Sequence, residues 1–296
     1  MNFYKKILRS KKLRFKILSA LRFIPDKPML KLQYRIKMGR KLNLKDPKRY
    51  TEKIQWYKLY YRDPVMAQCA DKYAVREFVK LRGLEHILND LYATFDTPDD
   101  ISFDNLPDKF VMKLSNGSGT NLICKDKSSL DLENVKREFL DYLSQTGSLA
   151  GREWVYHTTD NAVIVAEQYL EDPSQPGGIY DYKFLCFDGE PCYVVCDMDR
   201  FSHHRRNIYD MEWNNLCVSS DCPCCDENHP RPKMLNEMAE IARRLSKGFP
   251  AVRVDLYLVK DKIYFGEMTF FPWSGYVIFS PDNFDFELGK KFILPK

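Results

Sequence analysis

The stretch "VRVDLYLVKDKIYFGEMTF", residues 252–270, constrains the fold more than any other part of the chain. Two runs of strand-forming residues flank Lys260–Lys262, a pattern that predicts two antiparallel strands joined by a tight turn. Asp255 lies on the first strand and Glu267 on the second. Cross-strand neighbours project to the same face of a sheet, so the two carboxylates are predicted to converge at one point.

These two carboxylates lie among apolar residues, where an unpaired charge is costly, so each needs a partner. One partner is a metal ion, because converging carboxylates opposite a phosphate-binding loop hold Mg²⁺ that bridges nucleotide phosphates. The other is Arg253, which precedes Asp255 by two positions and shares its face of an extended strand. The hairpin by itself fits both a magnesium site and a structural Arg–Asp–Glu network.

A second informative stretch is "FVMKLSNGSGTNLICKD", residues 110–126. Asn116-Gly117 between two apolar runs is a hairpin turn signal. A plain hairpin explains neither Lys113 nor the second glycine, Gly119. A phosphate-covering loop explains both, because glycine backbone can approach a polyphosphate closely while the lysine neutralises it. Alone, the stretch leaves both interpretations open, since glycine-rich signals are weak by themselves.

Two further strands carry candidate binding groups. "AVIVAEQYLED", residues 162–172, is an apolar strand that ends in a linker, and such a linker can present backbone N–H and C=O groups to an adenine edge. A carboxylate slightly further on can meet the ribose hydroxyls. "IYDYKFLCFDG", residues 179–189, places Asp181 and Lys183 on one strand face, where Lys183 offers a second cation for phosphates. Each stretch taken alone also fits an ordinary strand.

The order of predicted elements indicates an α+β fold. The 296 residues suffice for about two domains. Residues 1–27 are predicted as a basic amphipathic helix, 28–100 as a mainly helical N-terminal subdomain, and 101–296 as the domain that carries the site. Within the last range we expect antiparallel strands, interrupted by helices near residues 131–144 and 231–247.

Composition narrows the class of protein. A hydrophobic fraction of 44% and an aromatic fraction of 14% indicate a folded globular chain. No window approaches 18 uncharged apolar residues, and no secretion signal is recognisable, so we expect a cytoplasmic location. Several of the nine cysteines lie inside apolar strands, which suits a reducing compartment. The remaining cluster fits either a zinc site or a cysteine-rich loop, and consists of Cys217, Cys222, Cys224, Cys225 and His229.

The positive charge of the chain is concentrated in its first 24 residues, which hold eight Lys or Arg and no acid. Subtracting those eight from the formal net charge of +5 leaves −3 for the rest, so we expect no nucleic-acid-binding face. Apolar residues recur at helical spacing among the lysines. Such a helix can lie on an anionic membrane surface, at the inner face of the cytoplasmic membrane, or dock on the domain as an ordinary solvated helix.

Taken in order, these motifs resemble the ATP-grasp superfamily, and more narrowly the TupA-like branch named for teichuronopeptide biosynthesis. The stretches that carry the resemblance are "DKYAVREFV", "KFVMKLSNGSGTN", "EQYLED", "DYKFLCFDGEP" and above all "RVDLYLVKDKIYFGEMTFFPWSGY". They run from about residue 28 to the C-terminus. The resemblance implies a nucleotide held between two α+β subdomains, with ATP and Mg²⁺ as cofactors.

The resemblance also implies roles for individual residues around the nucleotide. Lys113 is expected on the α- and β-phosphates, and Arg76 falls where other ATP-grasp ligases carry another phosphate-binding cation. The loop that closes over the phosphates is expected at Asn116, Gly117, Ser118 and Gly119. The adenine hinge is expected at Glu167, Gln168, Tyr169 and Leu170, with Asp172 as a ribose candidate.

For the acidic hairpin, the resemblance implies that Asp255 and Glu267 are magnesium ligands. Arg253 is then expected to stabilise charge on an acyl-phosphate or tetrahedral intermediate. Many ATP-grasp ligases place Asn two residues after the second carboxylate, whereas this chain has Thr269, whose hydroxyl can meet a phosphate or a metal-bound water. The glycines usual near "FPWSGY" are also reduced, with Trp273 in one of their places.

The activity implied is an ATP-dependent carboxylate–amine ligase of surface polysaccharide assembly in bacteria. ATP would activate a carboxylate as an acyl-phosphate, and an amine would displace the phosphate. The expected partners are an amine, such as an amino acid, and a uronic acid or lipid-linked glycan. A basic run, His203–Arg206, either meets an anionic sugar or forms a solvated loop. The alternatives are a phosphotransferase or glycosyltransferase of the same pathway and a catalytically idle nucleotide-binding scaffold.

Overall fold

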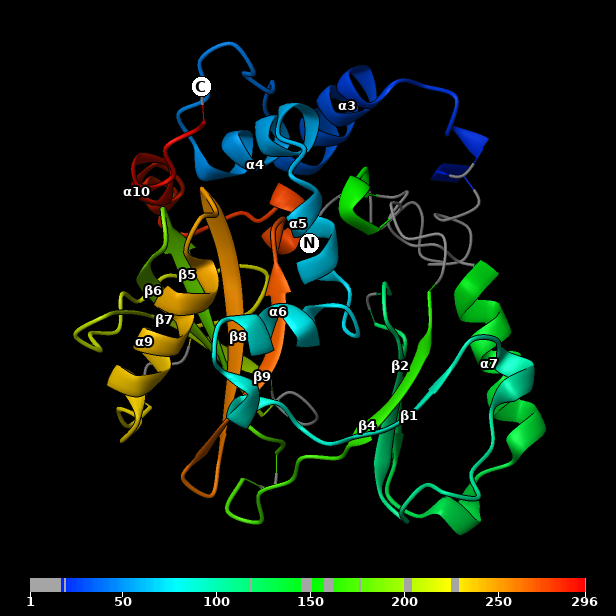
Figure 1. The fold of residues 1–296 in the computed structure, drawn as a ribbon. Helices are drawn as coiled ribbons and strands as arrows, with labels where there is room; N and C mark the ends of the chain where they lie inside the picture. The colour runs from blue at the N-terminus through cyan, green and yellow to red at the C-terminus, as the bar shows by residue number, and fades with distance from the viewer. Residues whose placement is uncertain are drawn as a thin grey trace. The chain divides into compact units, whose positions relative to one another are not determined.

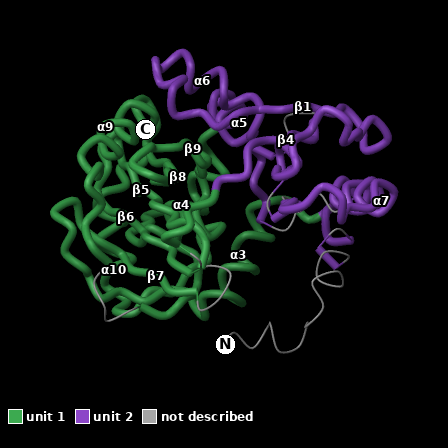
Figure 2. The backbone as a smooth tube through the Cα atoms, turned by 90° about the horizontal axis from the view of Figure 1, so that it is seen from below, with its two compact units in different colours: residues 1–7, 24–62, 171–296 green, residues 8–23, 63–170 purple. Residues whose placement is uncertain are grey.

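A computed structural model describes residues 17, 18, 20–117, 119–144, 151–156, 162–175, 177–199, 204–224 and 229–295. The chain divides into two compact units (Figure 2). Unit 1 consists of residues 1–7, 24–62 and 171–296, and unit 2 of residues 8–23 and 63–170. This division differs from the predicted boundary at residue 100, because segments distant in sequence pack together within unit 1.

Unit 1 is built on a five-stranded antiparallel sheet with the strand order β7-β6-β5-β8-β9 (Figure 1). Its strands are β5 (Asp181–Phe187), β6 (Glu190–Met198), β7 (Arg205–Asp210), β8 (Ala251–Val259) and β9 (Lys262–Thr269). Its helices are α3 (Asp26–Met38), α4 (Tyr50–Tyr60), α9 (Leu235–Ser246) and α10 (Asn283–Lys291).

The two faces of this sheet differ in chemistry. One face carries buried apolar side chains such as Phe184, Val194 and Val254, and α9 packs against the strands that bear them. Because side chains alternate along a strand, the residues between these positions point to the opposite face. That face holds the buried charged residues of β5, β6 and β8 together with Glu267 of β9, so the sheet itself separates the apolar core from these charged groups.

Helix α4 is fixed to α10 through its N-terminus. The Asp285 carboxylate, which is 1% exposed, accepts hydrogen bonds from the backbone N–H of Thr51 (2.9 Å) and from its hydroxyl (2.8 Å). It thereby satisfies a helix N–H that has no partner within α4. Gly289 of α10 is needed at this contact, since a Cβ there would lie 2.1 Å from the Lys48 carbonyl oxygen.

Unit 2 contains a four-stranded antiparallel sheet with the strand order β1-β4-β2-β3. Its strands are β1 (Leu91–Phe95), β2 (Phe110–Leu114), β3 (Asn121–Cys124) and β4 (Ile164–Gln168). Its helices are α5 (Pro64–Ala70), α6 (Val75–Leu81) and α7 (Leu132–Ser144), of which α7 packs against β2.

One face of this second sheet forms the core of unit 2. Phe110, Met112 and Ala166 are fully buried there and pack with Val135 and Phe139 of α7. The alternate positions of β2 and β4 point to the other face, which carries the charged pair described below. Both sheets therefore have one apolar face under a helix and one face with ionisable groups.

The predicted strands and helices are confirmed with two exceptions. Strand β1 lies within the range predicted to be mainly helical. Its sequence, "LYATF", shows no clear alternation of apolar and polar residues, so the strand becomes evident only from its pairing with β4. Strand β7 begins at Arg205, in the run predicted as a basic cluster or solvated loop. Residues 1–16, which carry most of the predicted basic helix, lie outside the described residues. Among the helices that the structure describes, none has the length and apolarity to cross a membrane.

Candidate functional site

The predicted convergence of the acidic hairpin is confirmed by the strand register of unit 1. Asp255 of β8 lies directly opposite Glu267 of β9, and Lys183 of β5 lies opposite Asp255 on its other side. One row of the sheet thus places a lysine and two carboxylates on neighbouring strands. Asp255 is 1% exposed, whereas the Glu267 side chain is 44% exposed. The two acids therefore lie at different depths.

Arg253 joins the two carboxylates. Its Nε donates to Asp255 Oδ1 and its Nη2 to Asp255 Oδ2, each at 2.7 Å. The same Nη2 donates to Glu267 Oε1 at 2.8 Å and lies 3.1 Å from Thr269 Oγ1. The bidentate geometry makes this a strong charge-assisted contact. A positive charge consequently stands between the two acids.

Lys183 forms the other half of this network. Its Nζ donates to Asp255 Oδ2 at 2.9 Å and contacts Asp181 Oδ2 closely. Asp197 Oδ2 lies 3.8 Å away. Because Lys183 is itself buried, its ammonium needs these carboxylates, just as the buried carboxylates need the ammonium. In this row each buried charge therefore lies next to a charge of opposite sign.

Burial and charge act in opposite directions on these groups. Burial raises the pKa of Asp255 to about 6, although Arg253 and Lys183 favour its charged form. Burial lowers the pKa of Lys183, but the neighbouring Asp181 and Asp255 outweigh burial and raise it overall. Burial also disfavours the charged Arg253, but Asp255 and Glu267 raise its pKa well above the usual range. Both cations therefore stay charged at neutral pH.

The donor set suits Mg²⁺ in chemistry. Asp255 and Glu267 offer hard carboxylate oxygens side by side. Arg253 Nη2 donates to both carboxylates, which shows that positive charge is stabilised between them. Across the described part of the chain, no group of three or more His, Cys, Asp or Glu side chains is arranged to hold a metal ion. Mg²⁺ bound here would therefore take its remaining ligands from phosphate oxygens and water, as this ion commonly does.

The predicted basic run is not a free cationic patch. Arg206 of β7 is 8% exposed, and its Nε donates to Asp197 Oδ1 at 2.6 Å. Its Nη1 donates to Ser220 Oγ at 3.1 Å and contacts Asp221. His204 Nε2 lies 2.9 Å from the same Asp197 Oδ1. The Arg206 guanidinium is therefore paired with Asp197 and Asp221, and it joins the loop that follows β7 to the sheet. His203 lies outside the described residues.

Unit 2 brings together the other predicted cations and the start of the hinge. Lys113 of β2 contacts Glu167 Oε1 of β4 on the face opposite the apolar core. The Lys113 side chain is 23% exposed and that of Glu167 11%. Arg76 donates to Asn89 Oδ1 at 3.0 Å and to its carbonyl oxygen at 2.7 Å. Burial lowers the pKa of Arg76, and the nearby Glu167 opposes that shift.

The glycine loop is anchored by the preceding motif "DKYAVR". Asp71 Oδ2 accepts a hydrogen bond from Ser115 Oγ at 2.6 Å, and the Lys72 N–H donates to the Ser115 carbonyl at 2.8 Å. Lys72 Nζ contacts the carbonyl oxygen of Gly117. A Cβ at Gly117 would lie 2.6 Å from Thr120 Oγ1, so this position needs glycine.

The other predicted loop and hinge residues are placed as follows. Gly119 has φ +70°, and Ser118 lies outside the described residues. The Gln168 N–H donates to the Asp90 carbonyl at 2.9 Å. Tyr169 lies below Lys125, with the ammonium 5.9 Å from the ring centroid. The units divide between Leu170 and Glu171, so the predicted hinge runs up to the point where the chain passes from unit 2 to unit 1.

Two further predictions concern unit 1. The Asp172 carboxylate is tied locally, since its Oδ1 accepts from the Ser174 N–H at 2.9 Å and from the Ser174 hydroxyl at 2.7 Å. The segment after β9 is held by α4, because Lys58 Nζ donates to the Ser274 carbonyl at 2.9 Å. Trp273 and Ser274 have φ of +51° and +54°. The reduced glycine content here therefore coincides with backbone conformations that glycine would adopt more readily.

The described members of the cysteine cluster face separate partners. Cys222 Sγ donates to the His204 carbonyl (3.2 Å), Cys224 Sγ to Asn207 Oδ1 (3.5 Å), and His229 Nε2 lies 3.1 Å from the Tyr182 hydroxyl. Cys225 lies outside the described residues. Among the described residues, the members of this cluster form no group that could hold a metal ion, and the choice between a zinc site and a cysteine-rich loop stays a prediction for the whole cluster.

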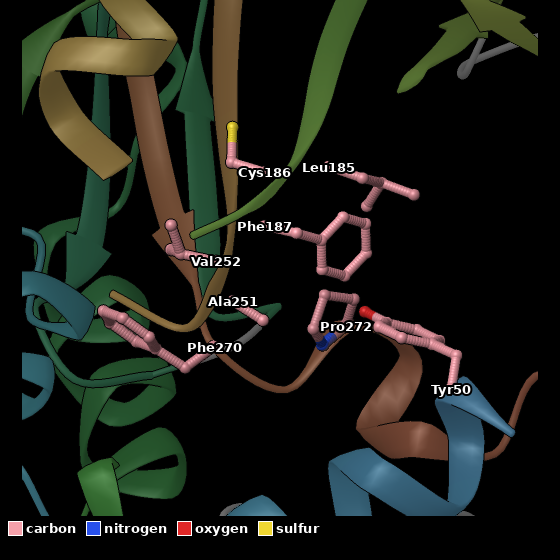
Figure 3. Close-up of a pocket in the computed structure, with 8 residues that line it drawn as sticks. All are labelled: Tyr50, Leu185, Cys186, Phe187, Ala251, Val252, Phe270 and Pro272. Atoms are coloured by element: carbon pink, nitrogen blue, oxygen red, sulfur yellow. The ribbon is translucent and has the colours of Figure 1, made fainter. Parts of the chain in front are cut away.

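One small pocket in unit 1 is not suited to a nucleotide (Figure 3). Its lining is Tyr50, Leu185, Cys186, Phe187, Ala251, Val252, Phe270 and Pro272. It offers no charged side chain that could neutralise a phosphate.

Comparison with known proteins identifies the family of the chain. The sequence profile of the family described as TupA-like ATPgrasp matches residues 52–293. The chain has the ATP-grasp fold, and its helices with two antiparallel sheets confirm the α+β class expected from the sequence. It belongs to the TupA-like ATP-grasp family. No curated protein matches the chain by sequence.

Solved structures similar to the chain include other ATP-grasp proteins. D-alanine–D-alanine ligase from Bacillus anthracis, complexed with ATP, shares 15% identity over 68% of this chain and 53% of that one, with a TM-score of 0.39. The corresponding ligase from Helicobacter pylori shares 15% identity over 77% and 59%, with a TM-score of 0.43. A RimK domain ATP-grasp protein from Sphaerobacter thermophilus shares 10% identity over 77% and 69%, also with a TM-score of 0.43. The chain thus spans little more than half the length of these D-alanine–D-alanine ligases.

Three further residues shape the charged face: Asp181, which the sequence places on the strand face of Lys183, Arg206, which lies in the predicted basic run, and Asp197, which no motif indicates. Asp181 and Asp197 lie opposite each other on β5 and β6, and Arg206 lies opposite Asp197 on β7. The Asp188-Gly189 turn does not predict the first pair, because unbroken pairing from that turn would place Cys196 opposite Asp181. A register shift between Leu185 and Cys186 moves Asp197 to that position instead. Arg206 gave no signal either, since a basic run does not indicate a buried strand.

Proposed function

We propose that this protein is an ATP-dependent carboxylate–amine ligase. The observation that carries the proposal is the pair of neighbouring carboxylates, buried Asp255 and half-exposed Glu267, with Arg253 between them, inside the range matched by the family. Hard oxygen donors beside a fixed guanidinium are the groups required to hold Mg²⁺·nucleotide and to stabilise developing negative charge.

Unit 1 would supply the metal-binding and charge-stabilising groups. Asp255 and Glu267 would hold Mg²⁺, with the Thr269 hydroxyl beside them. Bound there, Mg²⁺ would neutralise charge on the transferred phosphoryl group. Arg253, already oriented by two hydrogen bonds to Asp255, would stabilise the acyl-phosphate or the tetrahedral intermediate. Lys183 would supply a further cation for phosphates.

Unit 2 would supply the groups that hold the nucleotide. Lys113 and Arg76 would neutralise phosphate charge, and the loop Asn116–Gly119 would cover the phosphates with glycine backbone. Residues 167–170 would present backbone groups to the adenine, and Asp172 of unit 1 would meet the ribose. The Lys113–Glu167 contact would orient the lysine side chain before nucleotide binds.

The proposed reaction joins an amino acid or another amine to a uronic acid in a bacterial surface polysaccharide, such as a capsule, O-antigen or teichuronic-type polymer. Family membership supports this assignment. The basic residues 1–24 would hold the protein at the inner face of the cytoplasmic membrane, close to a lipid-linked acceptor.

The alternative is a phosphotransferase or glycosyltransferase of the same pathway, and products separate the three. A ligase releases ADP and phosphate only when carboxylate and amine are both present. A kinase leaves phosphate on its product, and a glycosyltransferase consumes a sugar nucleotide without using ATP. Mass spectrometry of the surface glycan with and without the gene would identify the linkage made.

Glu267→Gln provides a test that requires no knowledge of the substrate. Its side chain is half-exposed, so the change removes a metal ligand with little effect on folding. We expect Mg²⁺-dependent ATP affinity, measured by calorimetric titration, to fall on the order of a hundredfold. Glu237→Gln, an exposed carboxylate of α9, is the matched control and should bind as wild type. Wild-type affinity in Glu267→Gln would refute the metal assignment.

A further inference from the structure

We propose that the outer face of helix α3 is a docking surface for an anionic lipid bilayer. Along α3, the exposed cations Lys27, Lys31 and Arg35 recur every four residues. Leu32 and Ile36, which are 50% and 48% exposed, form a second stripe directly beside them. Residues spaced by four lie on the same side of a helix, so α3 presents a cationic stripe next to an apolar one.

The rotation of α3 is fixed by its inner face. Leu30, Tyr34 and Met38 are buried and pack with Leu42, and the Tyr34 hydroxyl hydrogen-bonds Thr51 Oγ1 of α4 at 2.8 Å. In Figure 1, α3 lies beside α4 within unit 1. Because the inner face is held by this contact, the cationic and apolar stripes stay on the outside together.

The charges on the outer face are available for a partner. Within the described part of the chain, no carboxylate pairs with Lys31 or Arg35. The acid of α3, Asp26, lies at the first position of the helix and is 3.9 Å from Arg62. Lys27 Nζ lies 5.8 Å from the ring centroid of Tyr60, which is itself 47% exposed. An amphipathic tyrosine beside a lysine extends the surface onto α4.

These features favour a lipid surface over another class of partner. Exposed apolar side chains aligned with cations match the acyl boundary and the anionic headgroups of a bilayer simultaneously. In the sequence, α3 follows residues 1–24, which hold eight Lys or Arg and no acid. Stable membrane attachment generally takes two binding elements, and α3 provides a second one in addition to the basic N-terminal segment. The inference does not depend on the proposed enzymatic activity.

Co-sedimentation of the full chain with lipid vesicles tests the proposal. The vesicles are phosphatidylcholine alone or mixed with phosphatidylglycerol, each at low and high salt. We expect Lys31→Ala/Arg35→Ala to weaken partitioning onto the anionic vesicles about 25-fold, at about fivefold per cation. Leu32→Ser/Ile36→Ser should weaken it about tenfold, because a purely electrostatic contact would not sense these side chains.

Lys290→Ala/Lys291→Ala on α10 is the matched control, since it removes two exposed cations from another helix of unit 1. It should partition as wild type, and thermal unfolding should confirm that all variants fold. The proposal is overturned if the α3 charge variant partitions as wild type, or if the α10 control loses as much. An unaffected Leu32→Ser/Ile36→Ser variant would also overturn it, and would point instead to an acidic macromolecule.

Discussion

The two sheets differ in how the charged side chains on one face of each are neutralised. In unit 1, four acids and three basic residues are buried or partly buried on one face and compensate each other: Asp181, Asp197, Asp255, Glu267, Lys183, Arg206 and Arg253. In unit 2, one lysine meets one glutamate near the surface. The first face holds carboxylates in fixed positions, and the second holds a cation that can exchange partners.

The difference follows from burial. Asp255 is 1% exposed and is held by three hydrogen bonds from Arg253 and Lys183, so the loss of any partner leaves a buried charge. The Lys113 side chain is 23% exposed, so water can replace Glu167 as its partner. We therefore expect the unit 1 network to stabilise the fold and the unit 2 pair to matter mainly for binding.

The largest effect is expected for Asp255→Ala. Removing this carboxylate leaves Arg253 and Lys183 facing each other in a buried site, which should cost about 3–5 kcal/mol of unfolding free energy. Glu167→Gln in unit 2 should cost only about 1 kcal/mol, because its partner reaches water. Urea denaturation measures the unfolding free energy of both variants. Equal losses would contradict the expected difference between the two units.

A smaller effect is expected from Asp197 as pH falls. Burial alone would raise the pKa of Asp197, but the hydrogen bond and charge of Arg206, helped by Lys183, lower it to about 2 from 3.8. A depressed pKa in the folded state stabilises the fold above pH 3.8, and that contribution of about 2 kcal/mol is lost as pH falls through 2.

Asp197→Asn tests whether this carboxylate contributes to the pH dependence of stability. The variant should lose about 2 kcal/mol near pH 6, and its stability should decline less steeply than that of wild type between pH 4 and pH 2. Unfolding free energies measured across this range decide the matter. Parallel curves for the two proteins would mean that Asp197 does not titrate as the Arg206 contact implies.

The smallest effect is expected for Lys113→Ala. Losing one charge-assisted contact to phosphate should weaken ATP binding about tenfold, with little change in the thermal midpoint. Lys80→Ala, which removes an exposed lysine that pairs with Glu85 in unit 2, is the control and should bind as wild type. Unchanged ATP affinity in Lys113→Ala would remove the phosphate role proposed for unit 2.

Much of unit 1 could be predicted from its hairpins. The predicted convergence of Asp255 and Glu267 is confirmed, but strict alternation from the Lys260–Lys262 turn would pair Asp255 with Gly266. A register shift between Asp255 and Leu256 brings Glu267 opposite Asp255 instead. Lys183, predicted as a second cation for phosphates, is only 7% exposed, whereas an ordinary strand would leave such a lysine half-exposed. Its burial depends on β8, which lies beside β5 in the sheet although about seventy residues separate Lys183 from Asp255.

Side-chain alternation and turn residues act over a few positions, so the residue pattern of the chain is enough to locate most of the strands and the turns between them. The final pairing in the β5–β6 and β8–β9 hairpins also depends on a register shift in each. Tertiary structure alone decided that β7 joins the sheet and buries Arg206 on Asp197. It also decided that residues 24–62 pack with the C-terminal sheet rather than with the strands that follow them. These outcomes depend on which apolar faces cover one another across long stretches of chain, a choice that no short window of sequence contains.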